Sequence, residues 1–461
     1  VGDDASGCNF KPDPMNPGIH VKATDHVRLY NLSLLSGANG VTVSDSKKIT
    51  CENLVFRDLF NQMESRMLVR GSRDVSVEST YVYSSLGNPF MVVDGYNVSI
   101  KNSILYFSKN PGVLVLNSDK TNLENLHFNG QYKENLIIRD STDTVVRECQ
   151  IHNHVDNDLL MMIDNSQGTV IDDTVFYISD MIHQINEDIT LLLLTGNTDG
   201  TRIHGSSFNY NQWYPTPDAS LEGIKIVGSS NTTAVDECSF RNLESGLELF
   251  DDPYYPHHAD GFTVQNCTFQ GDELGMSAAL LGNMTVQGCT FTDCEESLGM
   301  FQGDFTVRDN VFSNFDMGAG QLGGTTTFVN NRMVNGTTGY WCQMWSMGMP
   351  NLKTLNNTML EMKTGYQMGS CAFELNSDHI NGSEASLKCR DTAESLVNHS
   401  VLDSDTPVFI ESSVIGQVVS VELRNCTGEY TDSDVPSPLC FANWTWPLTV
   451  EIYDELKDPL S

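Results

Sequence analysis

A six-residue pattern of apolar and polar positions recurs along most of this chain. It consists of an apolar anchor, a variable residue, a turn residue, a small residue, another variable residue and a second apolar residue, as in Val264 to Phe269. Its shortest steps are 21 to 23 residues. The 15 anchors are Leu29, Cys51, Val77, Ile100, Leu123, Val146, Ile171, Ile203, Val235, Val264, Val286, Val307, Phe328, Leu355 and Leu423. Such a short, regular period predicts a solenoid in which each turn stacks on the turn before.

The turn position is Asn, Asp or Gly in 12 of the 15 copies, and the exceptions are Ser79, Glu148 and Glu237. Asn, Asp and Gly tolerate a left-handed backbone at low steric cost, so this position predicts a corner between two short strands. The two apolar residues flanking each corner should then face inward. We also expect the corner amides, among them Asn102, Asn266 and Asn330, to form a hydrogen-bonded ladder inside the coil.

With this period, corner chemistry and pair of apolar ladders, the chain resembles the right-handed parallel β-helix, or pectin-lyase-like, superfamily. The resemblance implies an all-β fold, a single-stranded solenoid of about 15 coils. We expect a lead-in over residues 1–17, the β-helix over residues 18–430 and a tail or cap over residues 431–461. No activity follows from the resemblance, because function lies in sites carried by a fold.

Three successive steps are 32, 32 and 29 residues long, which predicts inserted loops over residues 177–200, 209–232 and 241–261. If the insertions occupy equivalent points, they form one three-loop face, where solenoids commonly bind ligands. Aromatic residues there are candidate sugar-stacking groups, and carboxylates beside them are candidate acids and bases. The ligand-binding candidates are Trp213, Tyr214, Tyr254 and Tyr255. The catalytic candidates, if the protein is an enzyme, are Asp199, Asp251, Asp252 and His258.

Two of these elements resemble the acidic motifs of the polygalacturonase-like hydrolases, namely Asn197 to Gly200 and the pair Asp251 and Asp252. The Gly-His-Gly and Arg-Ile-Lys motifs of that family are absent from the sequence, which puts the resemblance in doubt. The alternative interpretation is that the aromatic residues pack the loops onto the coil and the acids are solvated. These acids are candidate ligands for calcium, but we predict no metal site and no required cofactor.

The formal net charge is −34, with 60 acidic and 26 basic residues, which argues against a nucleic acid or an anionic membrane as partner. No apolar run approaches the 18 or so residues of a membrane span. The first residue is Val1, which is consistent with removal of a secretory signal. We therefore expect a protein that is extracellular or at the cell surface.

Eleven Asn-X-Ser/Thr sequons support that location. Three of them, at Asn31, Asn266 and Asn425, coincide with corner positions and are expected to be structural. The remaining eight are candidate glycosylation sites: Asn97, Asn231, Asn283, Asn335, Asn356, Asn381, Asn398 and Asn443.

Twelve cysteines without metal-ligand spacing also favour an oxidising compartment. Four of them, Cys149, Cys238, Cys267 and Cys289, share the small position after the corner and should stack on one inner wall. The disulfide candidates lie outside that register: Cys8, Cys342, Cys371, Cys389 and Cys440.

A second irregular segment, Asn335 to Pro350, contains Tyr340, Trp341 and several Met residues but no charge. It could pack against the coil or form an assembly contact. The leading hypothesis is therefore a secreted, glycosylated structural protein that self-associates into a filament, sheath or surface layer. The alternatives are a carbohydrate-active enzyme, hydrolase or lyase, and a glycan-binding adhesin, either of which would use the three-loop face.

Overall fold

The structure is a computed structural model, and it is built from β-strands that pair with one another in parallel. It describes residues 8–10, 17–35, 39–57, 65–85, 87–153, 158–178, 188–210, 220–228, 230–250, 260–279, 282–344, 349–390, 392, 395–411, 419–424, 426 and 440–445. The chain forms two compact units, Val1–Phe262 and Thr263–Ser461. Among the described residues there is no helix of the length and hydropathy that crossing a membrane requires.

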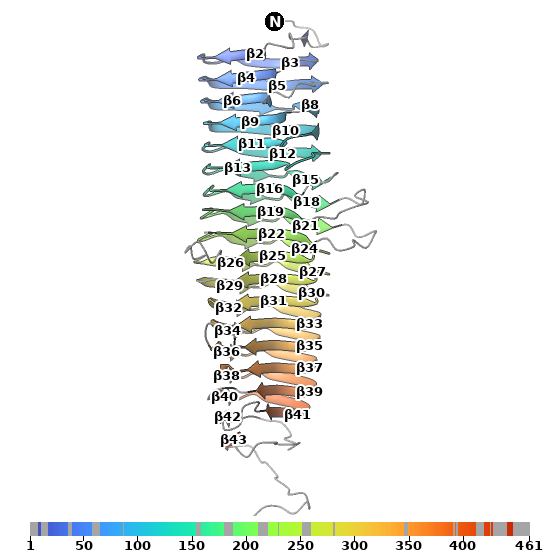
Figure 1. The fold of residues 1–461 in the computed structure, drawn as a ribbon, viewed down its shortest axis with the longest axis vertical. Coiled ribbons are helices and arrows are strands. Elements are labelled where there is room, and N and C mark those ends of the chain that lie inside the picture. Colours follow the sequence, from blue (N-terminus) through green and yellow to red (C-terminus); the bar gives the residue numbers. More distant parts are fainter. Residues whose placement is uncertain are drawn as a thin grey trace, which may run out of the picture. The chain divides into compact units, whose positions relative to one another are not determined.

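In the first unit each turn of the chain contributes a strand to three sheets in succession, here called sheets A, B and C (Figure 1). Sheet A contains β3 (Arg28–Leu35), β5 (Lys47–Arg57), β7 (Arg73–Glu78), β10 (Tyr96–Ser108), β12 (Asn122–Asn129), β14 (Val145–Arg147), β17 (Val170–Asp172), β20 (Arg202–His204) and β23 (Ala234–Asp236). Sheet B contains β1 (Cys8–Phe10), the second halves of β3, β5, β10 and β12, then β8 (Tyr81–Ser85), β15 (Gln150–Asn153), β18 (Val175–Ile178), β21 (Ser207–Tyr210) and β24 (Ser239–Arg241). Sheet C contains β2 (Pro17–Lys22), β4 (Asn39–Ser44), β6 (Ser65–Arg70), β9 (Asn88–Val93), β11 (Val113–Leu116), β13 (Leu136–Arg139), β16 (Leu159–Asp164), β19 (Ile189–Thr195), β22 (Leu221–Val227) and β25 (Ser245–Phe250).

The second unit repeats the same order of three strands per turn. Its sheet A contains β26 (Phe262–Gln265), β29 (Asn283–Gln287), β32 (Asp304–Arg308), β34 (Thr325–Val329), β36 (Asn351–Leu355), β38 (Ala372–Asn376), β40 (Ser395–Asn398), β42 (Val419–Arg424) and β43 (Cys440–Thr445). Strands β27 (Thr268–Gln270) and β30 (Thr290–Thr292) belong to its sheet B, and β28 (Leu274–Ala279) and β31 (Glu296–Phe301) to its sheet C. The longer strands β33 (Val311–Leu322), β35 (Arg332–Gln343), β37 (Thr358–Gly369), β39 (His379–Arg390) and β41 (Val401–Glu411) run through both sheets.

The core of each unit is a set of stacked apolar ladders, as the repeat predicts. In the first unit the rings of Phe176 and Phe208 stack with centroids 4.7 Å apart. In the second unit Phe269 and Phe291 stack at 4.7 Å, and Phe291 and Phe312 at 4.8 Å. These side chains are fully buried, so each turn covers the apolar surface of its neighbour. The all-β, parallel β-helix fold expected from the sequence is confirmed.

The corner between sheets A and B is a single left-handed residue. Asn102, Asn266 and Asn330 have φ angles of 50°, 53° and 54°, and the atypical corner residues Ser79 and Glu148 also have positive φ, at 53° and 52°. The left-handed geometry is thus confirmed. The predicted direction of the side chains is wrong, because the amides of these three asparagines are exposed.

The amide ladder runs along the outside of the corner. Asn125 Nδ2 donates to Asn102 Oδ1 at 2.8 Å, and Asn330 Nδ2 donates to Asp309 Oδ1 at 3.2 Å. Because the chain reverses its pleat at a left-handed residue, the inward side chain is the one after the corner. There the predicted inner wall is confirmed, with Cys149, Cys238, Cys267 and Cys289 all buried.

The register expected near Leu355 is off by one residue. Thr354 pairs with Phe328 and is buried, whereas Leu355 is exposed. The corner is Asn356, with a φ of 56°, and Asn357 is the buried residue after it.

Candidate functional site

The three insertions do not share one corner of the first unit. Residues 179–187 and 211–219 each follow a strand of sheet B, β18 or β21, and precede a strand of sheet C, β19 or β22. Residues 251–259 instead follow β25 of sheet C and precede β26. The prediction of a single three-loop face therefore differs from the structure. The candidates Trp213, Tyr214, Asp251, Asp252, Tyr254, Tyr255 and His258 lie outside the described residues.

Asp199 is described, and it is a structural corner residue. Its Oδ1 accepts the backbone N–H of Asn231 at 2.8 Å. Asn231 Oδ1 in turn accepts the backbone N–H of Asp260 at 2.8 Å. These residues occupy the same corner, between sheets C and A, in three successive turns. The Asp199 carboxylate therefore holds a ladder together, which accounts for its presence in an ordinary turn sequence.

The strongest constellation of functional side chains lies on the outer face of sheet C, where β22 and β25 pair. Glu222 is nearly buried, with 9% of its side chain exposed, and its Oε1 lies 2.6 Å from Lys225 Nζ. Its Oε2 accepts the Thr190 hydroxyl at 2.6 Å. Both carboxylate oxygens are thus engaged by donors, which compensates for the loss of solvent.

Glu248 completes this group, here called the Glu222 site. It is the pairing partner of Lys225 on the adjacent strand. Burial raises the pKa of Glu248, and the nearby charge of Glu222 raises it further, while Lys225 acts in the opposite direction. The site thus places an ion-paired carboxylate beside a carboxyl group that holds its proton to higher pH.

Local structure explains why these side chains meet. Thr190 and Glu222 are paired across β19 and β22, near the starts of the two strands that follow residues 179–187 and 211–219. Lys225 is three residues further along β22, and Gly223 and Ile224 between the two charges are both buried, which breaks the strict alternation of the strand. The long stem of Lys225 therefore reaches back to Glu222. The site therefore lies beside the two insertions that do share a corner.

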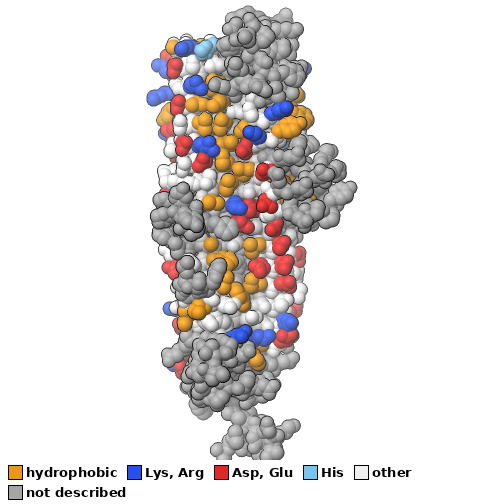
Figure 2. Space-filling model, viewed as in Figure 1, with side chains coloured by type: hydrophobic (Ala, Val, Ile, Leu, Met, Phe, Trp, Pro, Cys, Tyr) orange, Lys and Arg blue, Asp and Glu red, His pale blue; other side chains and the backbone are white. Residues whose placement is uncertain are grey.

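An apolar column on the outer face of sheet C ends at this site. Its members are paired from strand to strand, and the last of them, Leu193, pairs with Lys225. Hydrophobic side chains gather along this face in Figure 2. The column consists of Leu68, Met91, Leu114, Ile137, Met162 and Leu193. It carries no charge until Lys225, so the Glu222 site is the first polar group along this column.

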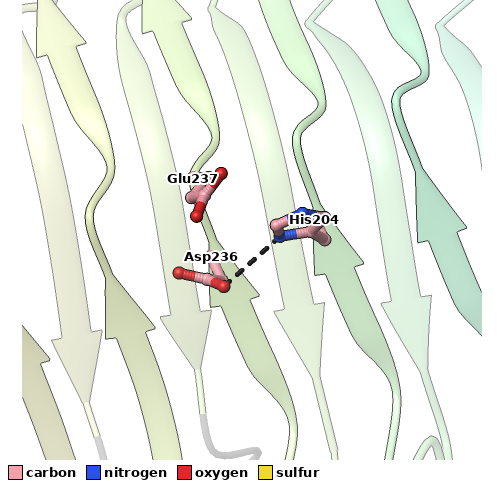
Figure 3. A group of neighbouring side chains, drawn as sticks. All are labelled: His204, Asp236 and Glu237. Atoms are coloured by element: carbon pink, nitrogen blue, oxygen red, sulfur yellow. Dashed lines mark ion pairs between the residues drawn. The ribbon is translucent and has the colours of Figure 1, made fainter.

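A second group, at the corner between sheets A and B, could contact a metal ion. The ligand atoms of His204, Asp236 and Glu237 lie within 4.8 Å of one another (Figure 3). His204 Nδ1 lies 3.3 Å from Asp236 Oδ2, without hydrogen-bond geometry. Arg202 is 3.9 Å from the same oxygen and competes with a cation for it. One imidazole and two carboxylates alone fall short of the six to eight oxygen ligands of calcium.

Sequence reasoning missed both groups. Glu222, Lys225 and Glu248 lie on strands, where charged residues read as ordinary solvent-facing positions of the alternating pattern. Glu237 was noticed only as an atypical corner residue. The available signal was the order Glu222, Gly223, Ile224, Lys225, in which two charges flank a buried pair on a strand that follows a long insertion.

The cysteine and sequon candidates have the following positions. Cys342, Cys371 and Cys389 are buried free thiols, and the hydrogen bond with Cys371 together with burial raises the pKa of Cys342. The structure does not describe the side chains of Cys8, Cys440 and Asn443. Five sequon asparagines are exposed, Asn97, Asn283, Asn335, Asn356 and Asn381, while Asn231 and Asn398 are partly buried.

The sequence matches a family model described as right handed beta helix region over residues 17–188, 67–255 and 255–402. No curated protein sequence matches the chain. Among solved structures it is similar to PfbA, a surface adhesin of Streptococcus pneumoniae, at 12% identity over 75% of this chain and 84% of that one, with a TM-score of 0.38. It is similar to a mutant of the PL6 family alginate lyase AlyGC at 9% identity over 96% and 98% of the two chains, with a TM-score of 0.33. The receptor binding domain of the Siphovirus 9NA tailspike shares 10% identity over 94% of this chain and 77% of that one, with a TM-score of 0.27.

Proposed function

Because this chain belongs to the right-handed β-helix family, whose fold leaves the reaction open, we propose from the Glu222 site that the protein is a polysaccharide hydrolase. In this proposal Glu248 is the general acid that protonates the glycosidic oxygen. Glu222 is the carboxylate that activates water or attacks the sugar.

The observation that carries the proposal is the contrast between the two carboxyl groups. Glu222 is held by the ammonium group of Lys225 and the hydroxyl of Thr190, so both of its oxygens are engaged by donors. Burial raises the pKa of Glu248, so this group keeps its proton to higher pH. Two carboxyl groups whose environments separate their protonation are the arrangement that glycoside hydrolysis requires.

A lyase mechanism fits the same residues less well. A lyase needs a base that removes a proton beside a carboxylate of the substrate, and Lys225 is the basic residue of this site. Its ammonium group is 2.6 Å from Glu222, so it is engaged in an ion pair with that carboxylate. The net charge of −34 also repels a polyuronate. A neutral polysaccharide is therefore the substrate class that we propose.

The proposed setting is extracellular, where polysaccharides are met. The insertion 211–219 precedes β22, and its Trp213 and Tyr214 are proposed to contact sugar rings beside Glu222. The eight sequons singled out above are proposed glycosylation sites of the secreted protein.

We do not carry the filament or sheath hypothesis forward, since no observation supports self-association. Its expected contacts are the coil ends or the uncharged segment Tyr340 to Pro350, in which Met344 and Met349 are exposed. Tyr340 and Cys342 in that segment are fully buried core residues of β35. They are therefore unavailable to a partner.

The test is release of reducing ends from xylan, galactomannan and mixed-linkage glucan, with alginate as an acidic comparison. We expect wild type to cleave at least one neutral polymer. Glu248→Gln and Glu222→Gln should each lower kcat by about 10²- to 10⁴-fold, because each removes a proton-transfer or nucleophilic group.

Asp164→Asn is the matched control, since Asp164 is also an ion-paired carboxylate on sheet C, 2.7 Å from Arg139. It should retain wild-type activity. Unchanged turnover in Glu248→Gln, or unsaturated products from alginate, would rule out the proposed hydrolase.

A further inference from the structure

Phe107, at the end of β10, has a conformation that its side chain disfavours. Its φ angle is +48°, in the left-handed region where a bulky residue is a genuine outlier. Half of the residue is nevertheless exposed. A left-handed aromatic residue that is half exposed carries backbone strain without filling the core, and such strain is concentrated at functional positions.

Gly130 of the next turn lies directly beside this ring. A Cβ atom built on Gly130 would lie 2.6 and 2.7 Å from two carbons of the Phe107 ring. Any side chain there would displace the ring. Gly130, with a φ of +75°, therefore leaves room for the Phe107 ring beside the backbone of the next turn.

Tyr132 places a second exposed ring in the turn that contains Gly130. It is 48% exposed, and its backbone N–H donates to the carbonyl of Ser108 at 2.8 Å. Gln131, fully buried between them, accepts from the backbone N–H of Ser108 at 3.2 Å and donates to the carbonyl of Leu105 at 3.0 Å. These bonds hold the turn of Tyr132 rigidly on the turn of Phe107.

We infer that Phe107 and Tyr132 form an aromatic platform on which rings of a neutral polysaccharide stack, as a non-catalytic subsite of the proposed hydrolase. The inference rests on the proposed function for the identity of the substrate. Aromatic rings offer a large apolar surface with little conformational freedom to lose, which suits the apolar faces of sugars.

The position of the platform relates it to the Glu222 site. Both rings lie at the corner between sheets B and C, the corner that also carries residues 179–187 and 211–219. Strand β13, which follows Tyr132, is three pairing steps from β22. At a strand spacing of about 4.8 Å, the turn of Tyr132 is about 14 Å, and the turn of Phe107 about 19 Å, from the Glu222 site along the coil. One extended polysaccharide chain can therefore reach both.

A protein partner fits this platform poorly. Two rings with the exposed lysines Lys109 and Lys133 beside them are far smaller than the roughly 800 Å² per partner of a stable protein interface. A wet, charged rim around a small aromatic patch suits a linear glycan instead.

The first experiment measures binding without turnover. Glu248→Gln protein is run in native gels cast with xylan, galactomannan or mixed-linkage glucan. Phe107→Ala or Tyr132→Ala in that background should weaken retardation by about three- to tenfold, as expected for one aromatic contact. Tyr30→Ala is the matched control, because Tyr30 is also exposed, at 37%, but lies on sheet A. Equal retardation of the platform variants and the control would overturn the inference.

A second variant separates binding from packing. Asn tolerates the left-handed backbone, so Phe107→Asn should raise the melting temperature while lowering retardation. A lower melting temperature with unchanged retardation would show that the ring only packs on Gly130, which contradicts the platform.

Failure of the two proposals gives different results. If wild type cleaves no polymer but retardation depends on Phe107, the hydrolase is wrong and the glycan platform stands. If Phe107→Ala cleaves polymer as fast as wild type and binds it equally, the platform is wrong and the hydrolase stands. Platform variants that lose cleavage of polymer but keep cleavage of oligosaccharides too short to span about 14 Å support both.

Discussion

Asn357 donates two hydrogen bonds to the carboxylate of Asp378 in the next turn of the second unit. The backbone N–H and Nδ2 of Asn357 lie 2.7 and 3.0 Å from Asp378 Oδ1. The hydroxyl groups of Thr354 and Tyr366 donate to Oδ2. The preceding members of this inner ladder, Asn310 and Asn331, are neutral amides. Asp378 thus places an ionisable group at a buried position that holds Asn in the three preceding turns.

This arrangement predicts that stability falls as pH rises from about 4 to about 6. Burial raises the pKa of Asp378 to about 6, although its four donors lower it. A carboxyl group whose pKa is raised in the folded state contributes stability below its unfolded pKa of about 4, and this contribution is lost as pH rises through the folded pKa. The expected loss from Asp378 between pH 4 and 8 is about 2 to 3 kcal/mol.

Asp378→Asn should remove this dependence, because its Oδ1 can accept from Asn357 and its Nδ2 can donate to the two hydroxyl groups. Urea unfolding at pH 4 and pH 8 measures the difference between variant and wild type. Asp309→Asn, at an exposed corner, serves as control. A variant that is less stable than wild type at pH 8 would contradict the assignment.

The exposed corners predict a stabilising substitution. Glu148 has a φ of 52° and an exposed side chain, so it bears the cost of the left-handed backbone without filling the core. Glu148→Gly should raise the free energy of unfolding by about 1 kcal/mol. Asn102→Ala should lower it by a similar amount, since Ala tolerates the left-handed conformation less well. Chemical denaturation of both variants measures these changes, and destabilisation by Glu148→Gly would argue against a strained corner.

The fold was predictable because its determinants are local and repeated. A short left-handed corner between two inward apolar residues fixes the turn, and the period fixes the stacking, so parallel strands follow from sequence alone. The direction of the corner side chain was not predictable from residue type, because Asn is equally suited to an inner or an outer ladder. Two turns with corners at Ser377 and His399, whose φ angles are 55° and 52°, were missed because Ser and His are not among the residue types that mark the corner in most other turns.

The candidate site was harder to predict, because its chemistry depends on neighbours distant in sequence. Glu248 acquires its raised pKa from burial and from Glu222 on the preceding turn, and neither effect leaves a local motif. Asp199, in contrast, stands in a motif-like sequence but is committed to a backbone hydrogen bond. The types of residue beside an insertion were therefore a weaker guide to the candidate site than the contacts that side chains make between neighbouring strands.

The cysteines of the inner walls should be unreactive in the native protein. Burial raises the pKa of Cys51, Cys149 and Cys294 to about 12, so the thiolate fraction at pH 8 is roughly 10³-fold below that of a free cysteine. We expect an aromatic disulfide reagent to label these residues only after unfolding. Labelling confined to Cys8 and Cys440 agrees with this expectation. Rapid labelling of Cys149 in the native protein would contradict it. A native mass that is lower by two hydrogens would indicate a disulfide between Cys342 and Cys371.

The proposed general acid predicts a specific shift in the pH profile of activity. Lys225 lowers the pKa of Glu248 through its positive charge, against the larger raising effects of burial and Glu222. Lys225→Met should therefore raise the pKa of Glu248, and the protonated acid should persist to higher pH. The alkaline limb of kcat/KM on the cleaved polysaccharide should move upward even though the maximum falls, because Glu222 loses its ion-pair partner. Asp164→Asn should leave the limb in place.

The variant Glu222→Gln should shift the pKa of Glu248 in the opposite direction, because it removes a negative neighbour and so should lower that pKa. Titration of ¹³C-labelled Glu in this variant measures the shift. An alkaline limb that stays fixed in Lys225→Met would assign the proton to another group and remove Glu248 from the mechanism.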